Sequence, residues 1–133
     1  MNEKDRFVNL LEVIAEIAEE NESAPVIVEG RRDLEALRRL GCAGEIVVFH
    51  SGGTLVEFCE TLGRRARRAV LLMDWDRKGA ILQSSLAHGL ALAGVEVVGG
   101  YRDGIRRWAN AQLKDIESLA PYVERGRRKF QVA

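Results

Sequence analysis

Cysteine and histidine are scarce in this sequence, with two of each among 133 residues. Cys42 and Cys59 form no CxxC pair and have no histidine cluster near them, so we expect neither a disulfide framework nor a zinc site. No apolar run is long enough to cross a membrane, and the acidic N-terminus lacks the basic start of a signal peptide. We therefore expect a soluble, cytoplasmic protein with no membrane partner.

Net charge is also absent, because 20 basic residues balance 20 acidic ones. The two signs are nevertheless separated along the chain: residues 1–24 carry two basic and seven acidic side chains, and residues 101–133 carry eight basic and four acidic ones. Most basic residues are arginines, whose planar guanidinium matches phosphate, although heat adaptation would also favour arginine. The basic end favours nucleic acid as a partner, and the acidic end leaves room for a homo-oligomer or a protein partner.

Short apolar segments alternate with helical patterns along most of the chain. Strands are expected within residues 24–30, 45–50, 69–73 and 95–100. Helices are expected at about residues 3–20, 31–41, 54–63 and 80–94, with one or two more at about 104–130. Strands that are apolar throughout and alternate with helices predict a parallel sheet. We therefore predict one α/β domain, with a Rossmann-like sheet of about four mainly parallel strands in residues 24–100 and a helical C-terminal extension.

Three acidic residues follow predicted strands. Glu29 closes the first strand, and Asp74 and Asp76 close the third. Because ligands bind beyond the carboxyl ends of parallel strands, these carboxylates are expected to share one crevice. Their mutual repulsion would be relieved by a divalent cation, and hard oxygen donors favour Mg²⁺, or Mn²⁺ in its place.

Each of these acids also has an ordinary structural role open to it. Asp74 could cap the helix that begins near Gly79. Glu29 could pair with Arg31 or Arg32. Asp33 sits in the first turn of its predicted helix, where it need only complement the helix dipole.

Two motifs carry a resemblance to a known family. "VIVEGRRDLEALRRLG" followed by "VLLMDWDRKG" resembles the toprim domain of topoisomerases, bacterial-type primases, OLD-type nucleases, recombination mediators and ribonuclease M5. The family's EG dipeptide is matched by Glu29-Gly30, its DxD pair by Asp74 and Asp76, and its following glycine by Gly79. The "SGGT" turn at 51–54 is similar to the family's glycine turn. Over its whole length the chain resembles the small stand-alone toprim proteins of archaea.

The resemblance implies a Mg²⁺-dependent domain that acts on phosphodiesters. Asp74 and Asp76 would hold the metal, and Glu29 would hold metal or move a proton. Lys78 stands where some relatives carry a further acid, which leaves fewer ligands for a second metal. The chain lacks the further domains of a topoisomerase or primase, and the zinc site of a recombination mediator. We expect a small nuclease or RNA-processing enzyme, with a non-catalytic nucleic-acid-binding or adaptor protein as the alternative.

Basic residues near the predicted strand ends are the candidate phosphate contacts. They are Arg31, Arg32, Lys78, Arg102, Arg106 and Arg107. The cluster "RRARR" at 64–68 precedes the third strand, at the opposite end from the predicted site, and is read mainly as a solvated face. A DxD also occurs in phosphatases of the haloacid dehalogenase type, but there it follows the first strand. Trp75 and Trp108 are expected to pack, and His50 and His88 to serve structural roles.

Overall fold

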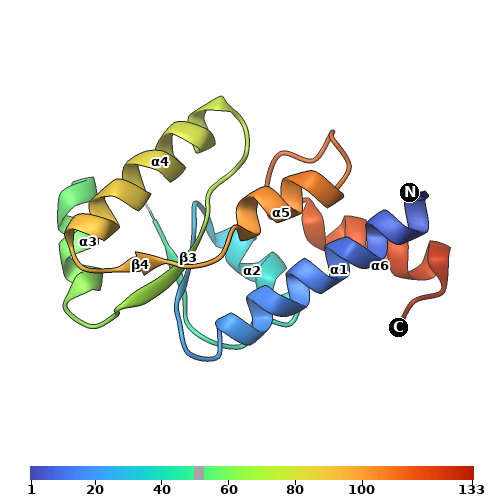
Figure 1. Ribbon diagram of the computed structural model, residues 1–133, viewed down its shortest axis with the longest axis horizontal. Coiled ribbons are helices and arrows are strands. Elements are labelled where there is room, and N and C mark those ends of the chain that lie inside the picture. The colour runs from blue at the N-terminus through green and yellow to red at the C-terminus, as the bar shows by residue number, and fades with distance from the viewer. Residues whose placement is uncertain (50–52) are drawn as a thin grey trace.

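The computed structural model describes residues 1–49 and 53–133, which form a four-stranded sheet with six helices around it (Figure 1). The strands are β1 (Val26–Val28), β2 (Ile46–Val48), β3 (Arg68–Leu72) and β4 (Glu96–Val97). Their order is β2-β1-β3-β4, and every pair of neighbours is parallel. The predicted α/β class with a mainly parallel sheet is therefore confirmed.

Both faces of the sheet are buried, as continuous apolar strands require. The helices are α1 (Glu3–Glu20), α2 (Arg31–Arg39), α3 (Leu55–Gly63), α4 (Arg77–Leu92), α5 (Tyr101–Trp108) and α6 (Leu119–Phe130). Val26 and Val28 of β1 point into the core shared with α1, α2, α5 and α6, whereas Ile27 points into the core shared with α3 and α4. Figure 1 shows these two groups of helices on opposite sides of the sheet.

The predicted elements are present, with some boundaries moved. α4 begins at Arg77, three residues before its expected start at 80, and α5 begins at Tyr101. Thr54 caps α3 by accepting the N–H of Glu57 at 3.0 Å, and Pro121 lies in the first turn of α6, where its missing N–H costs nothing. Part of the "SGGT" turn, together with His50, lies outside the described residues. Cys42 and Cys59 are both buried and free.

The acidic first helix and the basic last helix contact each other within the chain. Nζ of Lys129 in α6 lies 3.0 Å from a carboxylate oxygen of Glu3 in α1. A Cβ added to Gly126 would lie only 2.2 Å from the ring of Phe7, so glycine permits the close approach of the two helices. Part of the charge separation seen along the sequence is thus used internally. No helix in the described part of the chain is long and apolar enough to span a membrane.

Candidate functional site

The order of the strands reverses between β1 and β3. The chain passes from β1 to its outer neighbour β2, and from β3 to its outer neighbour β4. Parallel sheets commonly bind ligands beyond the carboxyl ends of the two strands between which the order reverses, here β1 and β3. Glu29 directly follows β1, and Asp74 lies two residues beyond β3. The register pairs Val28 with Leu72, which places both acids at the same end of the sheet.

Glu29 and Asp74 are in direct contact. The backbone N–H of Asp74 donates a hydrogen bond of 2.6 Å to Oε2 of Glu29. In the described part of the chain no arginine pairs with Glu29, because Arg31 lies 3.7 Å from Glu35 and Arg32 lies 3.4 Å from Glu117. The ordinary ion pair considered for Glu29 is therefore not formed.

The Asp74 carboxylate lies among other negative groups. Its Oδ1 is buried and has no hydrogen-bond partner among the described residues. Burial is the largest cause that raises the pKa of Asp74, to about 7, and the charge of Glu29 is the next, with smaller effects from Asp33, Asp115 and Asp76. Among the described residues Asp74 forms no ion pair, and the nearby Arg102 guanidinium donates to backbone oxygens instead.

Asp76 has a structural role as well as a candidate functional one. It is the N-cap of α4, and its Oδ1 accepts the backbone N–H of Gly79 at 2.7 Å. The helix-capping role considered for Asp74 therefore belongs to Asp76. The Asp76 side chain is exposed.

The turn between the two aspartates and α4 is held tightly from two directions. A Cβ added to Gly79 would lie 1.8 Å from the backbone oxygen of Asp74, so only glycine fits at this position. The guanidinium of Arg102 donates to the backbone oxygens of Met73 at 3.0 Å and Asp74 at 2.8 Å. Arg102 is 8% exposed. The Arg102 guanidinium thus supports the backbone of the aspartate turn, and its expected contact with phosphate stays a prediction.

Residues 109–118, between α5 and α6, complete one wall of the site. Trp75 donates its backbone N–H to the oxygen of Lys114 at 3.0 Å and its indole N–H to the oxygen of Leu113. Its ring is half-buried, as expected for a packing role. Sequence reasoning missed Asp115, which reaches the site only through the fold of this segment and contributes to the field on Asp74.

Asp33 ties α2 to this wall. Its Oδ2 accepts the N–H of Gly30 at 3.0 Å, and its Oδ1 accepts the N–H of Glu117 at 2.9 Å. Burial is the main cause that raises its pKa. Asp33 thus does more than the dipole role expected for a first-turn carboxylate, because it fixes the segment that carries Asp115.

The site's residues fit a hard divalent cation in their chemistry. The donors are carboxylates, without histidine or cysteine, and the buried Oδ1 of Asp74 has no partner among the described residues. Glu29 and Asp76 each already accept a backbone N–H through one oxygen. Within residues 1–49 and 53–133, no three histidine, cysteine or acidic side chains converge closely enough to form a ready metal cage. Metal binding would therefore draw the carboxylates together.

The remaining basic residues fall into two groups. Arg31, Arg32, Lys78, Arg106 and Arg107 are exposed, and the guanidinium of Arg107 stacks on Trp108 at 4.7 Å from the ring centre. At the other end of the sheet, Arg65 pairs with Glu45 at 2.7 Å and Arg68 pairs with Glu20 at 2.5 Å. These pairs agree with reading the 64–68 cluster mainly as a solvated face.

Comparison with known proteins gives consistent relatives. No family model matches the chain. A UPF0292 protein of Methanocaldococcus jannaschii is 34% identical over 94% of this chain and 98% of its own length. A UPF0292 protein of Methanosarcina acetivorans is 32% identical over 98% of this chain and 90% of its own length. A UPF0292 protein of Thermoplasma volcanium is 35% identical over 79% of this chain and 87% of its own length.

A solved structure supports the fold independently. A protein from Aquifex aeolicus has a TM-score of 0.69 to this chain at 23% sequence identity, and the match covers 80% of this chain and 94% of that one. At this identity the likeness concerns the fold alone. The sequence relatives are archaeal and match nearly end to end. The chain therefore belongs to the UPF0292 family.

Proposed function

We propose that this protein is a Mg²⁺-dependent toprim protein that hydrolyses phosphodiester bonds in nucleic acid. One observation carries the proposal: a buried oxygen of Asp74, without a hydrogen-bond partner in residues 1–49 and 53–133, lies beside Glu29 where the strand order reverses. Burial and the neighbouring carboxylates raise the pKa of Asp74 to about 7, and a bound cation would relieve this unfavourable environment of its charged form. The toprim resemblance assigns metal binding to these same residues.

The chain's own residues can be given roles in such a reaction. Asp74 and Asp76 would hold the metal, and bound Mg²⁺ would neutralise charge on the scissile phosphate and lower the pKa of an attacking water. Glu29 would accept the proton from that water as general base. Its carboxylate is oriented for this role by the N–H of Asp74. Arg31 and Arg32, exposed at the start of α2, would contact flanking phosphates in exchange for their surface ion pairs with Glu35 and Glu117.

The experiment that tests this function compares cleavage by the wild type, Asp74→Asn and Asp76→Asn. Labelled single-stranded, duplex and hairpin RNA and DNA are incubated with Mg²⁺ or Mn²⁺ and separated on denaturing gels. We expect metal-dependent cleavage by the wild type and loss of at least a hundredfold in both variants. Asp5→Asn, an exposed aspartate of α1, is the matched control and should retain full activity. Equal activity in wild type and Asp74→Asn would refute the proposal.

A second function is favoured by a specific observation. Glu29 and Asp76 each already accept a backbone N–H, and the described residues hold no ready cage of three ligands. A protein that uses these acids for structure would bind nucleic acid without cutting it, as an adaptor in a larger complex. Binding that is unchanged by metal, without cleavage of any substrate, would select this second function.

A further inference from the structure

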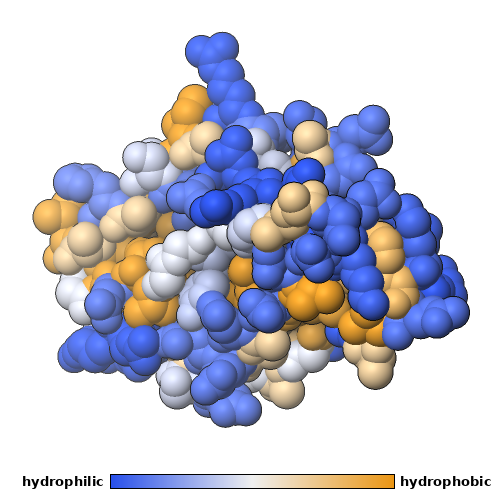
Figure 2. All heavy atoms as spheres, turned by 45° about the vertical axis from the view of Figure 1, so that its right-hand side comes forward, coloured by the Kyte–Doolittle hydropathy of each residue, from blue (hydrophilic) through white to orange (hydrophobic). Residues whose placement is uncertain are grey.

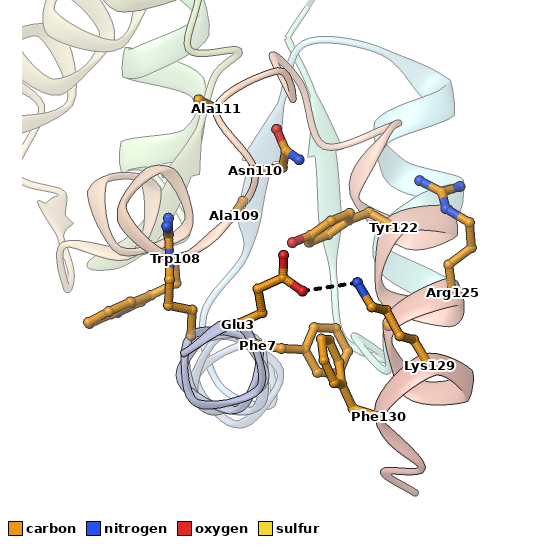
Figure 3. Close-up of a pocket in the computed structure, with 12 residues that line it drawn as sticks. Glu3, Phe7, Trp108, Ala109, Asn110, Ala111, Tyr122, Arg125, Lys129 and Phe130 are labelled. Carbon is orange, nitrogen blue, oxygen red and sulfur yellow. Dashed lines mark hydrogen bonds and ion pairs between the residues drawn. The ribbon is translucent and has the colours of Figure 1, made fainter. Parts of the chain in front are cut away.

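A groove away from the carboxylates lies between α1, α6 and the end of α5 (Figure 3). Its volume is about 610 Å³, within the range of ligand pockets. Four aromatic side chains line it: Phe7, Trp108, Tyr122 and Phe130. Figure 2 turns this end of the molecule towards the reader and shows apolar surface bordered by hydrophilic side chains.

The aromatic lining is organised around Phe7. Tyr122 meets the Phe7 ring edge-on, with centroids 6.5 Å apart and planes at 72°, and Phe130 lies 5.5 Å from it. Phe7 itself is 2% exposed and packs against Gly126, so its ring is held in place by the contact between α1 and α6. The rings of Tyr122 and Phe130 are only partly buried. They are therefore held in place while keeping surface open to a ligand.

The rim of the groove is positively charged. Arg6, Arg125 and Lys129 line it against a single acid, Glu3, which pairs with Lys129. In the part of the chain that the structure describes, Arg125 is in no ion pair, and Arg6 donates only a long hydrogen bond of 3.4 Å to the oxygen of Arg107. Two arginines are thus available to an anionic ligand.

The groove is connected through the chain to the carboxylate site. Ala109, Asn110 and Ala111 form part of its wall. The residues that follow them carry Leu113 and Lys114, which bind Trp75, and Glu117, which binds Asp33. The same segment therefore contributes to the wall of the groove and to the wall of the carboxylate site.

We infer that this groove binds single-stranded nucleic acid, with bases against Tyr122 and Phe130 and phosphates on Arg6 and Arg125. The inference rests on the proposed function for its choice of substrate class and specifies the strandedness. Partly exposed aromatic rings combined with arginines match a strand whose bases are unpaired, because base stacking and backbone charge then act together. A duplex hides its base faces and would use the arginines alone.

Binding is tested in EDTA, so that it is measured without cleavage. Fluorescein-labelled RNA and DNA strands of about 12 nucleotides, and the matching duplexes, are titrated with protein and followed by anisotropy. The double variant Arg6→Gln/Arg125→Gln should weaken single-strand binding about tenfold. The slope of log affinity against log salt concentration should become shallower by about 0.7 for each lost phosphate contact. Arg64→Gln with Arg67→Gln is the matched control, since these exposed arginines lie beyond α3, away from the groove.

The stacking part of the inference has its own variant. Tyr122→Leu keeps an apolar contact with Phe7 but removes the flat ring, and should weaken single-strand binding about tenfold while leaving duplex binding unchanged. Quenching of Trp108 fluorescence by bound strand should disappear in Trp108→Phe. Thermal melting followed by circular dichroism verifies that each variant is folded.

The outcomes separate this inference from the proposed function. Weaker single-strand binding in the groove variants, with the control variant unchanged, supports the inference whether or not the protein cleaves. Equal losses in groove and control variants, or tighter binding of duplex than of single strands, would overturn it even if Asp74→Asn abolishes cleavage. A concentration-dependent dimer that dissociates in the groove variants would also overturn it, by giving the groove to a second copy of the chain.

Discussion

The backbone N–H of Asp74 donates to the Glu29 carboxylate at 2.6 Å, so the acid that ends β1 fixes the backbone of the acid that ends β3. This contact makes the two positions interdependent. Glu29 orients the aspartate turn, and its charge also raises the pKa of Asp74, second only to burial. Removing the charge of Glu29 is therefore a different change from removing its hydrogen-bond acceptor.

Glu29→Gln separates these two effects. The amide oxygen of glutamine can still accept the Asp74 N–H, so we expect the fold to remain while the pKa of Asp74 falls below its wild-type value. Cleavage should be lost, because an amide cannot act as general base. The pKa of Asp74 is measured by following its carboxyl carbon by NMR during a pH titration.

Glu29→Ala is the companion variant. It removes the acceptor as well as the charge and leaves the Asp74 N–H without this partner, so we expect a further loss of about 1 to 2 kcal/mol in the free energy of unfolding. An Asp74 pKa that is the same in wild type and Glu29→Gln would contradict the electrostatic coupling.

The metal-free protein should become less stable as the pH rises towards neutrality. The pKa of Asp74 is raised from 3.8 to about 7 in the folded state, so folding favours the protonated form. The stabilisation is complete below the pKa of Asp74 in the unfolded chain, and it is lost as the pH rises through the pKa of Asp74 in the folded protein. We expect Asp74→Asn to reduce this loss by about 1 to 2 kcal/mol, allowing for solvent screening.

Urea unfolding between about pH 4 and pH 8 measures this dependence. Part of it should remain in Asp74→Asn, because the pKa of Asp33 is also raised, chiefly by burial. Adding Mg²⁺ at neutral pH should stabilise the wild type more than the variant, because a ligand stabilises the state that binds it. If the free energy of unfolding depended on pH in the same way in the wild type and in Asp74→Asn, the raised pKa of Asp74 would be contradicted.

Arg102 should be a structural support of the site whose loss affects metal binding. Arg102→Met removes two hydrogen bonds from a buried charge to the oxygens of Met73 and Asp74 and leaves these oxygens without this donor. We expect a loss of about 2 to 4 kcal/mol in the free energy of unfolding and weaker Mn²⁺ binding, measured by electron paramagnetic resonance.

Arg106→Met is the matched control on the same helix. Arg106 is exposed, so its replacement should change the free energy of unfolding by no more than about 0.5 kcal/mol. Arg102→Lys can keep one donor and should lie between the wild type and Arg102→Met. If folded Arg102→Met bound Mn²⁺ with wild-type affinity, Arg102 would contribute to stability but not to metal binding.

Much of this site could be predicted from the sequence, because it depends on short-range patterns. Apolar runs locate β1 and β3, and Glu29 and Asp74 follow these runs within two residues. If the two strands are parallel neighbours, both acids lie at the same end of the sheet. What sequence reasoning missed depends on contacts between distant segments. Arg102 looks like one more surface arginine until it is seen to bind carbonyl groups 28 and 29 residues earlier. Asp115 lies in a connection whose position is set by Trp75 and Asp33.

Gly79→Ala should disrupt the aspartate turn although it adds only one methyl group. The new Cβ would lie 1.8 Å from the backbone oxygen of Asp74, and neither group is at the end of a flexible side chain. The backbone must therefore move, which we expect to cost about 3 kcal/mol or more and to weaken Mn²⁺ binding. Gly100→Ala is the control, since a Cβ there meets no atom within 4 Å. Because Asp76 caps α4 through the N–H of Gly79, the movement should displace both aspartates together. A Gly79→Ala protein with wild-type stability and Mn²⁺ affinity would show that the turn tolerates this displacement and is not tightly constrained.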